Sequence, residues 1–296
     1  MKSKWKWILI SVLALLAIAF LIVPAKKELV VRVRLPLERV MLEFEDTTHL
    51  VKWYAPYQSK AYAIEVEKPN PFTFIFLHQK DGKTNPLFFV VSPDTTDSKV
   101  TKIIFRYEAS RLPIPGDDLS ESAAQSLQRL EEWMGTTEYV YGHNIVMTTV
   151  TDSSFLFQTR VVASDQESAE AKKIFDELIA YAEKRNAHYN GVRIYYTQSP
   201  KKGQTAIYAS IGVDTYTPTG PDENIQYKMM PYGKKLLVMD YEGPFAQTRE
   251  MYRILEDYKR DNSLVSMAIP FQKFLSPGYG FADTQVVKTR ISYPVF

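Results

Sequence analysis

One order of secondary-structure signals occurs twice between residues 155 and 294, and this repetition restricts the fold more than any other feature. Each copy contains a strand, an amphipathic helix and two further strands. The predicted strands lie at 155–163, 191–197 and 205–213 in the first copy, and at 234–241, 270–276 and 284–294 in the second. Two β-α-β-β units predict a duplicated α+β domain over 137–296, with two helices on one sheet face and a concave antiparallel second face.

The helices of this domain are predicted from apolar spacing. The first has Ile174, Leu178, Tyr181 and Ala182 on one face, and the second has Met251, Leu255 and Tyr258. Ser164 and Glu167 have the spacing of a capping box, which predicts where the first helix begins.

A second α+β domain is predicted over 29–136. A strand at 29–34 precedes Pro36 and a helical face formed by Leu37, Val40, Met41 and Phe44. The following strands are expected at 61–67, 72–78, 86–92 and 99–108, and a closing helix from Asp118 to Gly135. Trp53, Trp133 and the strand at 72–77 are expected to form its core rather than a cofactor site.

The first 28 residues form a separate segment. Residues 8–23 are sixteen uncharged residues, with three lysines before them and two after, and this predicts a transmembrane helix at the N-terminus. A cleaved signal peptide is the alternative, since Val23-Pro24-Ala25 is a usable cleavage site. In either case the remaining chain is expected on the extracytoplasmic side of the membrane.

Composition excludes several classes of function. The 296 residues carry 36 Lys and Arg against 34 Asp and Glu, a net charge of +2, which argues against nucleic acid as a partner. Cysteine is absent, and none of the four histidines has a metal-binding spacing, so neither a metal nor a cofactor is expected. The sequence also has no P-loop, no dinucleotide-binding glycine motif and no nucleophile elbow.

The segment VVRVRLPLERVMLEFEDTTHLVKWYAPYQ, with Pro36, Trp53 and Pro56, resembles the start of the START-related, polyketide-cyclase-like (SRPBCC) superfamily. This resemblance implies a small helix-grip-like domain with a pocket under its long C-terminal helix. It carries over no fixed set of catalytic residues.

The segment MMPYGKKLLVMDYEGPFAQTREMYRILEDY resembles the GyrI-like, AraC-type effector-binding domain. The matching positions are Pro231, Gly233, Gly243, Pro244 and Tyr252, and the closing TRISYPVF matches the family's last strand. The resemblance covers about 140–296. It implies a groove that binds small amphipathic or cationic molecules, and a minority of such domains are hydrolases.

The ligand-binding residues are predicted from strand alternation. Where the family commonly has a glutamate on the last strand, this chain has Arg290, which favours carboxylates or phosphates over cations. If Arg290 faces the groove, Lys288 and Ser292 do too, while Ile291 and Tyr293 face the helices. The full set of candidates is Arg160, Arg193, Tyr195, Tyr208, Tyr241, Glu242 and Arg290. An ordinary solvated sheet face is the alternative.

The leading hypothesis is a membrane-anchored, non-catalytic protein that binds a small amphipathic, anionic ligand. The competing hypothesis is a hydrolase of reactive small molecules, with Glu242 as base and Tyr195 or Tyr241 as proton donor or orienting group. A transcriptional regulator is a weaker third hypothesis, because no helix-turn-helix segment precedes the domain.

Overall fold

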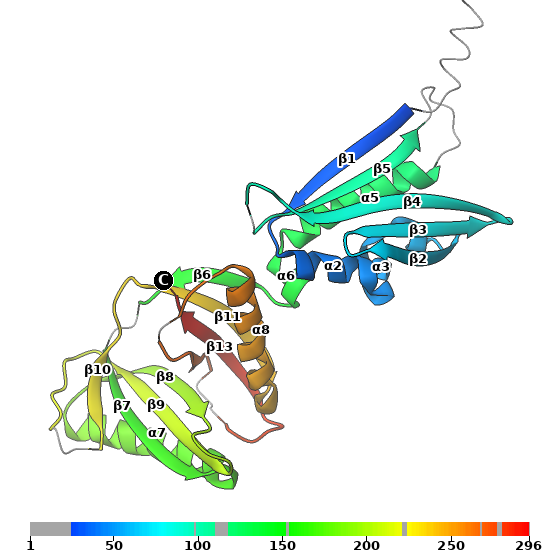
Figure 1. The fold of residues 1–296 in the computed structure, drawn as a ribbon. Helices are drawn as coiled ribbons and strands as arrows, with labels where there is room; N and C mark the ends of the chain where they lie inside the picture. Colours follow the sequence, from blue (N-terminus) through cyan, green and yellow to red (C-terminus); the bar gives the residue numbers. More distant parts are fainter. Residues whose placement is uncertain are drawn as a thin grey trace, which may run out of the picture. The chain divides into compact units, whose positions relative to one another are not determined.

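The computed structural model describes residues 25–97, 99–109, 118–151, 154–220, 224–266, 268–276 and 280–295. The chain forms two compact units, of which the first ends at Val140 and the second begins at Tyr141 (Figure 1). Within the described residues, no helix is both long and apolar enough to span a membrane. The predicted transmembrane segment, 8–23, lies outside the described residues. Residues 25–28, which the predicted N-terminal segment included, belong to the first strand of the first unit.

The first unit contains a five-stranded antiparallel sheet in the order β1-β5-β4-β3-β2. Its elements are β1 (Ala25–Val33), α2 (Leu37–Glu45), α3 (Thr47–Trp53), α4 (Ala55–Gln58), β2 (Ala63–Asn70), β3 (Thr73–Lys80), β4 (Lys83–Pro93), β5 (Thr101–Ala109), α5 (Asp118–Met134) and α6 (Thr137–Tyr141). The long helix α5 lies along β1 and β5 (Figure 1). Asp81 and Gly82 make the two-residue turn between β3 and β4, with φ of 51° and 75°, which suits a primed hairpin turn.

Aromatic side chains fill the space between this sheet and its helices. The Phe44 ring lies 5.3 to 6.1 Å, between ring centroids, from those of Trp53, Phe74, Phe76 and Phe89. The expected core role is therefore confirmed for Trp53 and for Phe74 and Phe76 of the 72–77 strand, whereas Phe72 is exposed. Trp133 is partly buried and packs against this core. The START-related assignment of this unit stays a prediction.

The second unit contains one eight-stranded antiparallel sheet. Its elements are β6 (Ile145–Thr149), β7 (Ser154–Ala163), η1 (Ser164–Gln166), α7 (Glu167–Lys184), β8 (Tyr189–Gln198), β9 (Gln204–Val213), β10 (Gln226–Met229), β11 (Lys235–Pro244), η2 (Phe245–Gln247), α8 (Thr248–Asp261), β12 (Phe271–Phe274) and β13 (Val286–Pro294). The six strands of the two copies were all predicted, whereas the short edge strands β6 and β10 were not.

The strand order confirms the internal duplication. The sheet runs β10-β7-β9-β8-β12-β13-β11-β6. By their order in each copy, β7, β8 and β9 correspond to β11, β12 and β13. The sheet therefore contains the first, third and second strands of the first copy, followed by the second, third and first strands of the second copy. Each copy places a short 3₁₀ turn and a helix after its first strand, and Figure 1 shows α7 on the β7–β9 half and α8 on the β11–β13 half. The pseudo-twofold axis therefore passes between β8 and β12.

The two faces of this sheet differ in what covers them. On the face that carries α7 and α8, which we call the helix face, residues such as Leu156, Ile174, Ile211, Leu255 and Ile291 form the main core. The opposite face, which we call the second face, was predicted to be an open hollow. Part of it is instead buried by an apolar cluster of its own, made of Val150, Phe155, Ile194, Leu236, Val238 and Phe271. The second face is therefore not wholly open.

Candidate functional site

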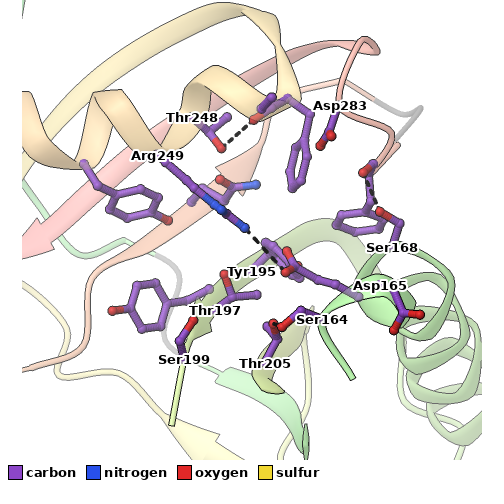
Figure 2. Close-up of a pocket in the computed structure, with 17 residues that line it drawn as sticks. Ser164, Asp165, Ser168, Tyr195, Thr197, Ser199, Thr205, Thr248, Arg249 and Asp283 are labelled. Carbon is purple, nitrogen blue, oxygen red and sulfur yellow. Dashed lines mark hydrogen bonds and ion pairs between the residues drawn. The ribbon is translucent and has the colours of Figure 1, made fainter. Parts of the chain in front are cut away.

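A pocket of about 720 Å³ lies on the helix face, at the junction of the two copies (Figure 2). The ladder between β8 and β12 is short, with Gln272 opposite Tyr195 and Lys273 opposite Ile194. Beyond Tyr195, β8 no longer pairs with β12. Thr197, near the end of β8, and Ser199, just after it, line the pocket. The short pairing at the pseudo-twofold axis thus leaves room for a cavity between the N-terminal ends of the two helices.

The duplication places equivalent positions on opposite walls of this pocket. Counted from the start of each 3₁₀ turn, the first, second, fourth and fifth positions of both copies line it. These residues are Ser164, Asp165, Glu167 and Ser168 in the first copy, and Phe245, Ala246, Thr248 and Arg249 in the second. The backbone is therefore approximately symmetric about the pocket, but the side chains that the copies contribute are not.

Glu167 is the most enclosed charged group of the pocket. Its side chain is 13% exposed, and one carboxylate oxygen accepts a hydrogen bond of 3.0 Å from the Tyr195 hydroxyl. Burial, together with the nearby Glu167 charge, raises the pKa of Tyr195 above its ordinary value, so this hydroxyl stays protonated and donates. The other oxygen lies 3.7 Å from the guanidinium of Arg249, whose side chain is 82% exposed and extends from α8 across the pocket (Figure 2).

The remaining lining is aromatic inside and polar at the rim. Tyr195, Phe245 and Phe281 are buried, and the Phe281 ring centroid lies 4.9 Å from that of Tyr195 and 5.5 Å from that of Phe245. Asp165 and Asp283 are exposed at the edge. Two further lining residues, Tyr252 and Gln272, have a buried polar atom that no other described residue contacts by a hydrogen bond.

The charges of the pocket sum to a negative value. Three carboxylates and one guanidinium line it, which leaves two net negative charges. The N-termini of α7 and α8 oppose this, but each is equivalent to only about half a positive charge. The pocket therefore attracts cations. In the described part of the chain, no cluster of three or more His, Asp or Glu residues has the arrangement of a metal site.

The seven predicted ligand-binding residues divide between the two sheet faces. Paired residues in an antiparallel ladder share a face, and Tyr195 pairs with Gln272, which pairs with Ile291 of the main core. Arg290 pairs with Lys273 and so lies on the opposite side of the sheet. The same registers place Arg160, Arg193, Tyr195 and Tyr241 on the helix face, and Tyr208, Glu242 and Arg290 on the second face. The prediction that Arg160, Arg193 and Tyr195 share a face with Arg290 is wrong, whereas the same prediction for Tyr208 is confirmed.

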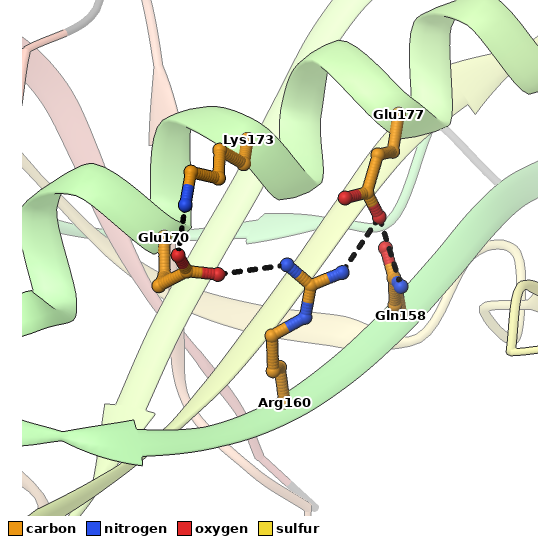
Figure 3. Close-up of polar contacts among 5 residues, drawn as sticks. All are labelled: Gln158, Arg160, Glu170, Lys173 and Glu177. Atoms are coloured by element: carbon orange, nitrogen blue, oxygen red, sulfur yellow. Dashed lines mark hydrogen bonds and ion pairs between the residues drawn. The ribbon is translucent and has the colours of Figure 1, made fainter.

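Among these seven residues, Tyr195 alone lines the pocket. Arg160 instead joins β7 to α7, because its guanidinium donates to Glu170 at 2.9 Å and to Glu177 at 2.6 Å (Figure 3). Arg193 is buried and donates to the backbone oxygen of Ser276 at 2.9 Å.

Tyr241 is also held by its own neighbourhood. Its hydroxyl lies 3.0 Å from the carbonyl oxygen of Pro244 and 3.1 Å from the side-chain oxygen of Gln247. It therefore ties the end of β11 to the turn before α8.

On the second face, the predicted anion-binding arginine is already neutralised. Arg290 makes a two-pronged ion pair with Asp240 on the neighbouring strand, at 2.6 and 2.9 Å. These hydrogen bonds hold the pKa of Asp240 below its usual value. Glu242 is likewise 3.4 Å from Lys288, and the Tyr208 ring stacks on Phe157. Arg290 therefore does not present a free guanidinium to an anionic ligand, as its predicted role requires.

Glu167 was missed because its sequence context indicated a different role. The Ser164–Glu167 spacing predicts a capping box, but α7 begins without a side-chain cap, and Glu167 accepts from Tyr195 instead. The signal that identifies it is the long-range pairing with β8, which local spacing does not contain.

Comparisons with known proteins give likenesses of fold only. No protein-family model and no curated protein sequence matches the chain. Among solved structures, the C-terminal domain of EcmrR is 14% identical with a TM-score of 0.42, covering 52% of this chain and 98% of that domain. EcmrR in its complex with DNA is 12% identical with a TM-score of 0.43, covering 61% and 72%. A hydrolase from Listeria innocua is 16% identical with a TM-score of 0.35, covering 52% and 92%. At these values, none of the three establishes a family for this chain.

Proposed function

We propose that the second unit binds a small cationic amphipathic molecule in the pocket between its two copies, without converting it chemically. One observation carries this proposal: the enclosed Glu167 carboxylate lies among aromatic rings, and its nearest cation is a largely exposed side chain. A carboxylate in such surroundings is costly to desolvate unless a positive charge accompanies it. A cation with an apolar body meets that requirement and also contacts the rings.

This proposal reverses the ligand charge that the sequence predicted. The anionic ligand followed from Arg290 as an anion-binding group in the groove, and that guanidinium is instead paired with Asp240 on the second face. The amphipathic character of the ligand is retained, because Tyr195, Phe245 and Phe281 supply an apolar wall.

The separation of the predicted catalytic groups argues against the hydrolase in which Glu242 is the base. Glu242, the predicted base, lies on the second face, whereas Tyr195 and Tyr241, the predicted proton donors, lie on the helix face. A base and a proton donor must reach the same substrate position, within about 3 Å. Groups on opposite sheet faces do not meet this condition.

The test compares two ions of the same shape and opposite charge. Tetraphenylphosphonium and tetraphenylborate are titrated calorimetrically into the purified full chain. We expect binding of the phosphonium only, and a loss of about tenfold or more in affinity for Glu167→Gln, because a charged partner is removed. Glu183→Gln is the control, since this substitution removes the same charge from an exposed part of α7. Equal affinity for the two ions, or an unchanged affinity in Glu167→Gln, contradicts the proposal.

The proposed location is at a membrane, with residues 8–23 as a retained anchor and the two units on the extracytoplasmic side. This part depends on the apolar run and its flanking lysines. Washing membranes with alkaline carbonate tests it, because an anchored chain stays in the pellet. Release of the chain into the soluble fraction contradicts the anchor.

A further inference from the structure

The pocket contains two buried polar groups that the cation-binding proposal does not use. The first is the side-chain amide of Gln272, a residue of β12 that is 1% exposed. Its Nε2 atom has no hydrogen-bond partner among the described residues, and neither has the buried hydroxyl of Tyr252 on α8. Both residues line the pocket that Glu167 lines.

Both groups are donors in this setting. A side-chain amide nitrogen donates two hydrogen bonds and accepts no hydrogen bond, and a phenol hydroxyl donates one. Burial raises the pKa of Tyr252 well above its ordinary value, so its hydroxyl remains protonated. A buried donor without an acceptor is unfavourable, and native proteins contain few of them.

We infer that the ligand carries, besides its positive charge, an uncharged acceptor oxygen such as a carbonyl, which accepts hydrogen bonds from Gln272 and Tyr252. This inference rests on the proposed function, because it assigns a second subsite of the same pocket. The cation lies toward Glu167 at the start of α7, and the acceptor lies toward β12 and α8. Ligands of this class are cationic esters, amides and ketones rather than simple alkyl cations.

The asymmetry between the copies supports this assignment. Tyr252 occupies the eighth position from the start of the second 3₁₀ turn, and the equivalent position of the first copy is Ala171, which is buried in the main core. The Tyr252 donor is therefore found on one side of the pseudo-twofold axis only. A hydrogen-bonding requirement on that side is a property of the pocket and not of the repeated fold.

The test uses two quaternary ammonium ions with equally long chains. Octanoylcholine contains an ester carbonyl, and undecyltrimethylammonium has only methylene groups in its chain. Both are titrated into the full chain below their micelle-forming concentrations. We expect octanoylcholine to bind about tenfold more tightly, because its carbonyl meets donors that are otherwise unpaired.

Variants then attribute this preference to the two residues. Gln272→Leu and Tyr252→Phe are each expected to reduce the preference, and together to abolish it, while undecyltrimethylammonium keeps its affinity. Gln204→Leu and Tyr208→Phe are the matched controls, since neither residue lines the pocket. Tyr252→Phe keeps the ring and therefore remains informative if Gln272→Leu folds poorly, which circular dichroism checks.

The outcomes separate this inference from the proposal beneath it. Measurable and equal binding of the two ammonium ions overturns the acceptor subsite and leaves cation binding intact. An ester preference that survives both substitutions also overturns the subsite. Binding of neither ammonium ion, together with no binding of tetraphenylphosphonium, overturns both statements.

Discussion

Arg249 provides the sharpest test of the pocket, because it occupies the place of the proposed ligand charge. Its guanidinium extends from α8 and lies 3.7 Å from the Glu167 carboxylate. A bound cation must displace this internal cation or share the carboxylate with it. Replacing Arg249 by alanine removes the competitor, so affinity for a cation is expected to increase.

The size of the increase follows from the distance and the exposure. At 3.7 Å, two unit charges attract each other by about 1 kcal/mol in a water-like dielectric and by about 4.5 kcal/mol at an effective dielectric constant of 20. The side chain of Arg249 is 82% exposed, which places the pair near the first value. Exposed ion pairs also lose side-chain entropy, so their net contribution is about 1 kcal/mol or less. Arg249→Ala is therefore expected to bind tetraphenylphosphonium up to about fivefold more tightly.

The assay is calorimetric titration of the full chain at low and at raised salt, because screening should reduce the gain. Arg253→Ala is the control, since Arg253 lies one turn further along α8 and pairs with Glu250 at 2.5 Å. It changes the net charge by the same amount but leaves Glu167 untouched. Weaker binding in Arg249→Ala, or the same gain in both variants, would refute the competition argument.

Three further predictions concern the stability of the two units and the role of Glu242. Burial lowers the pKa of His78, so below about pH 6.5 the unfolded chain binds more protons than the folded chain. The unfolding free energy of the first unit, measured in urea, should therefore fall as the pH falls, by at most about 1.4 kcal/mol per pH unit. A flat profile from pH 7.5 to 5.5 would contradict this. Leu255→Ala removes a fully buried side chain of the main core and should cost the second unit about 2–5 kcal/mol in the same assay. Glu242→Gln should leave tetraphenylphosphonium affinity within about twofold of the parent, because Glu242 pairs with Lys288 on the second face; a larger loss would mean that the second face takes part in binding.

The repeated fold was predictable because its signals are local. Alternating and β-branched runs such as 205–213 predict strands, and the spacing of Met251, Leu255 and Tyr258 predicts α8, without reference to distant residues. The edge strands β6 and β10 were missed because four or five residues are too few for a clear period. The predicted boundary of the domains, between 136 and 137, differs by four residues from the division between the two compact units.

The site was less predictable because it depends on strand register. Sequence alternation tells which residues of one strand share a face, but a shift of one residue between strands exchanges the faces. Tyr195 and Arg290 were assigned to one face in this way, and the ladder through Gln272 and Lys273 separates them. The partner of Arg290, Asp240, is 50 residues away, and no local pattern announces such a pair.

The duplication also explains why the pocket is expected to hold its ligand in one orientation. Two equivalent helix ends meet at the pseudo-twofold axis, and with identical side chains they would bind a molecule equally well in two orientations related by that axis. The copies have diverged at the lining positions, since Glu167 corresponds to Thr248 and Ser168 to Arg249. The negative charge is therefore concentrated on the α7 side, and the unpaired donors of Gln272 and Tyr252 lie on the β12–α8 side. A ligand with a cation at one end and an acceptor oxygen at the other satisfies both sides in one orientation only, because reversing it would place its charge against the donors of Gln272 and Tyr252 and its acceptor against the Glu167 carboxylate.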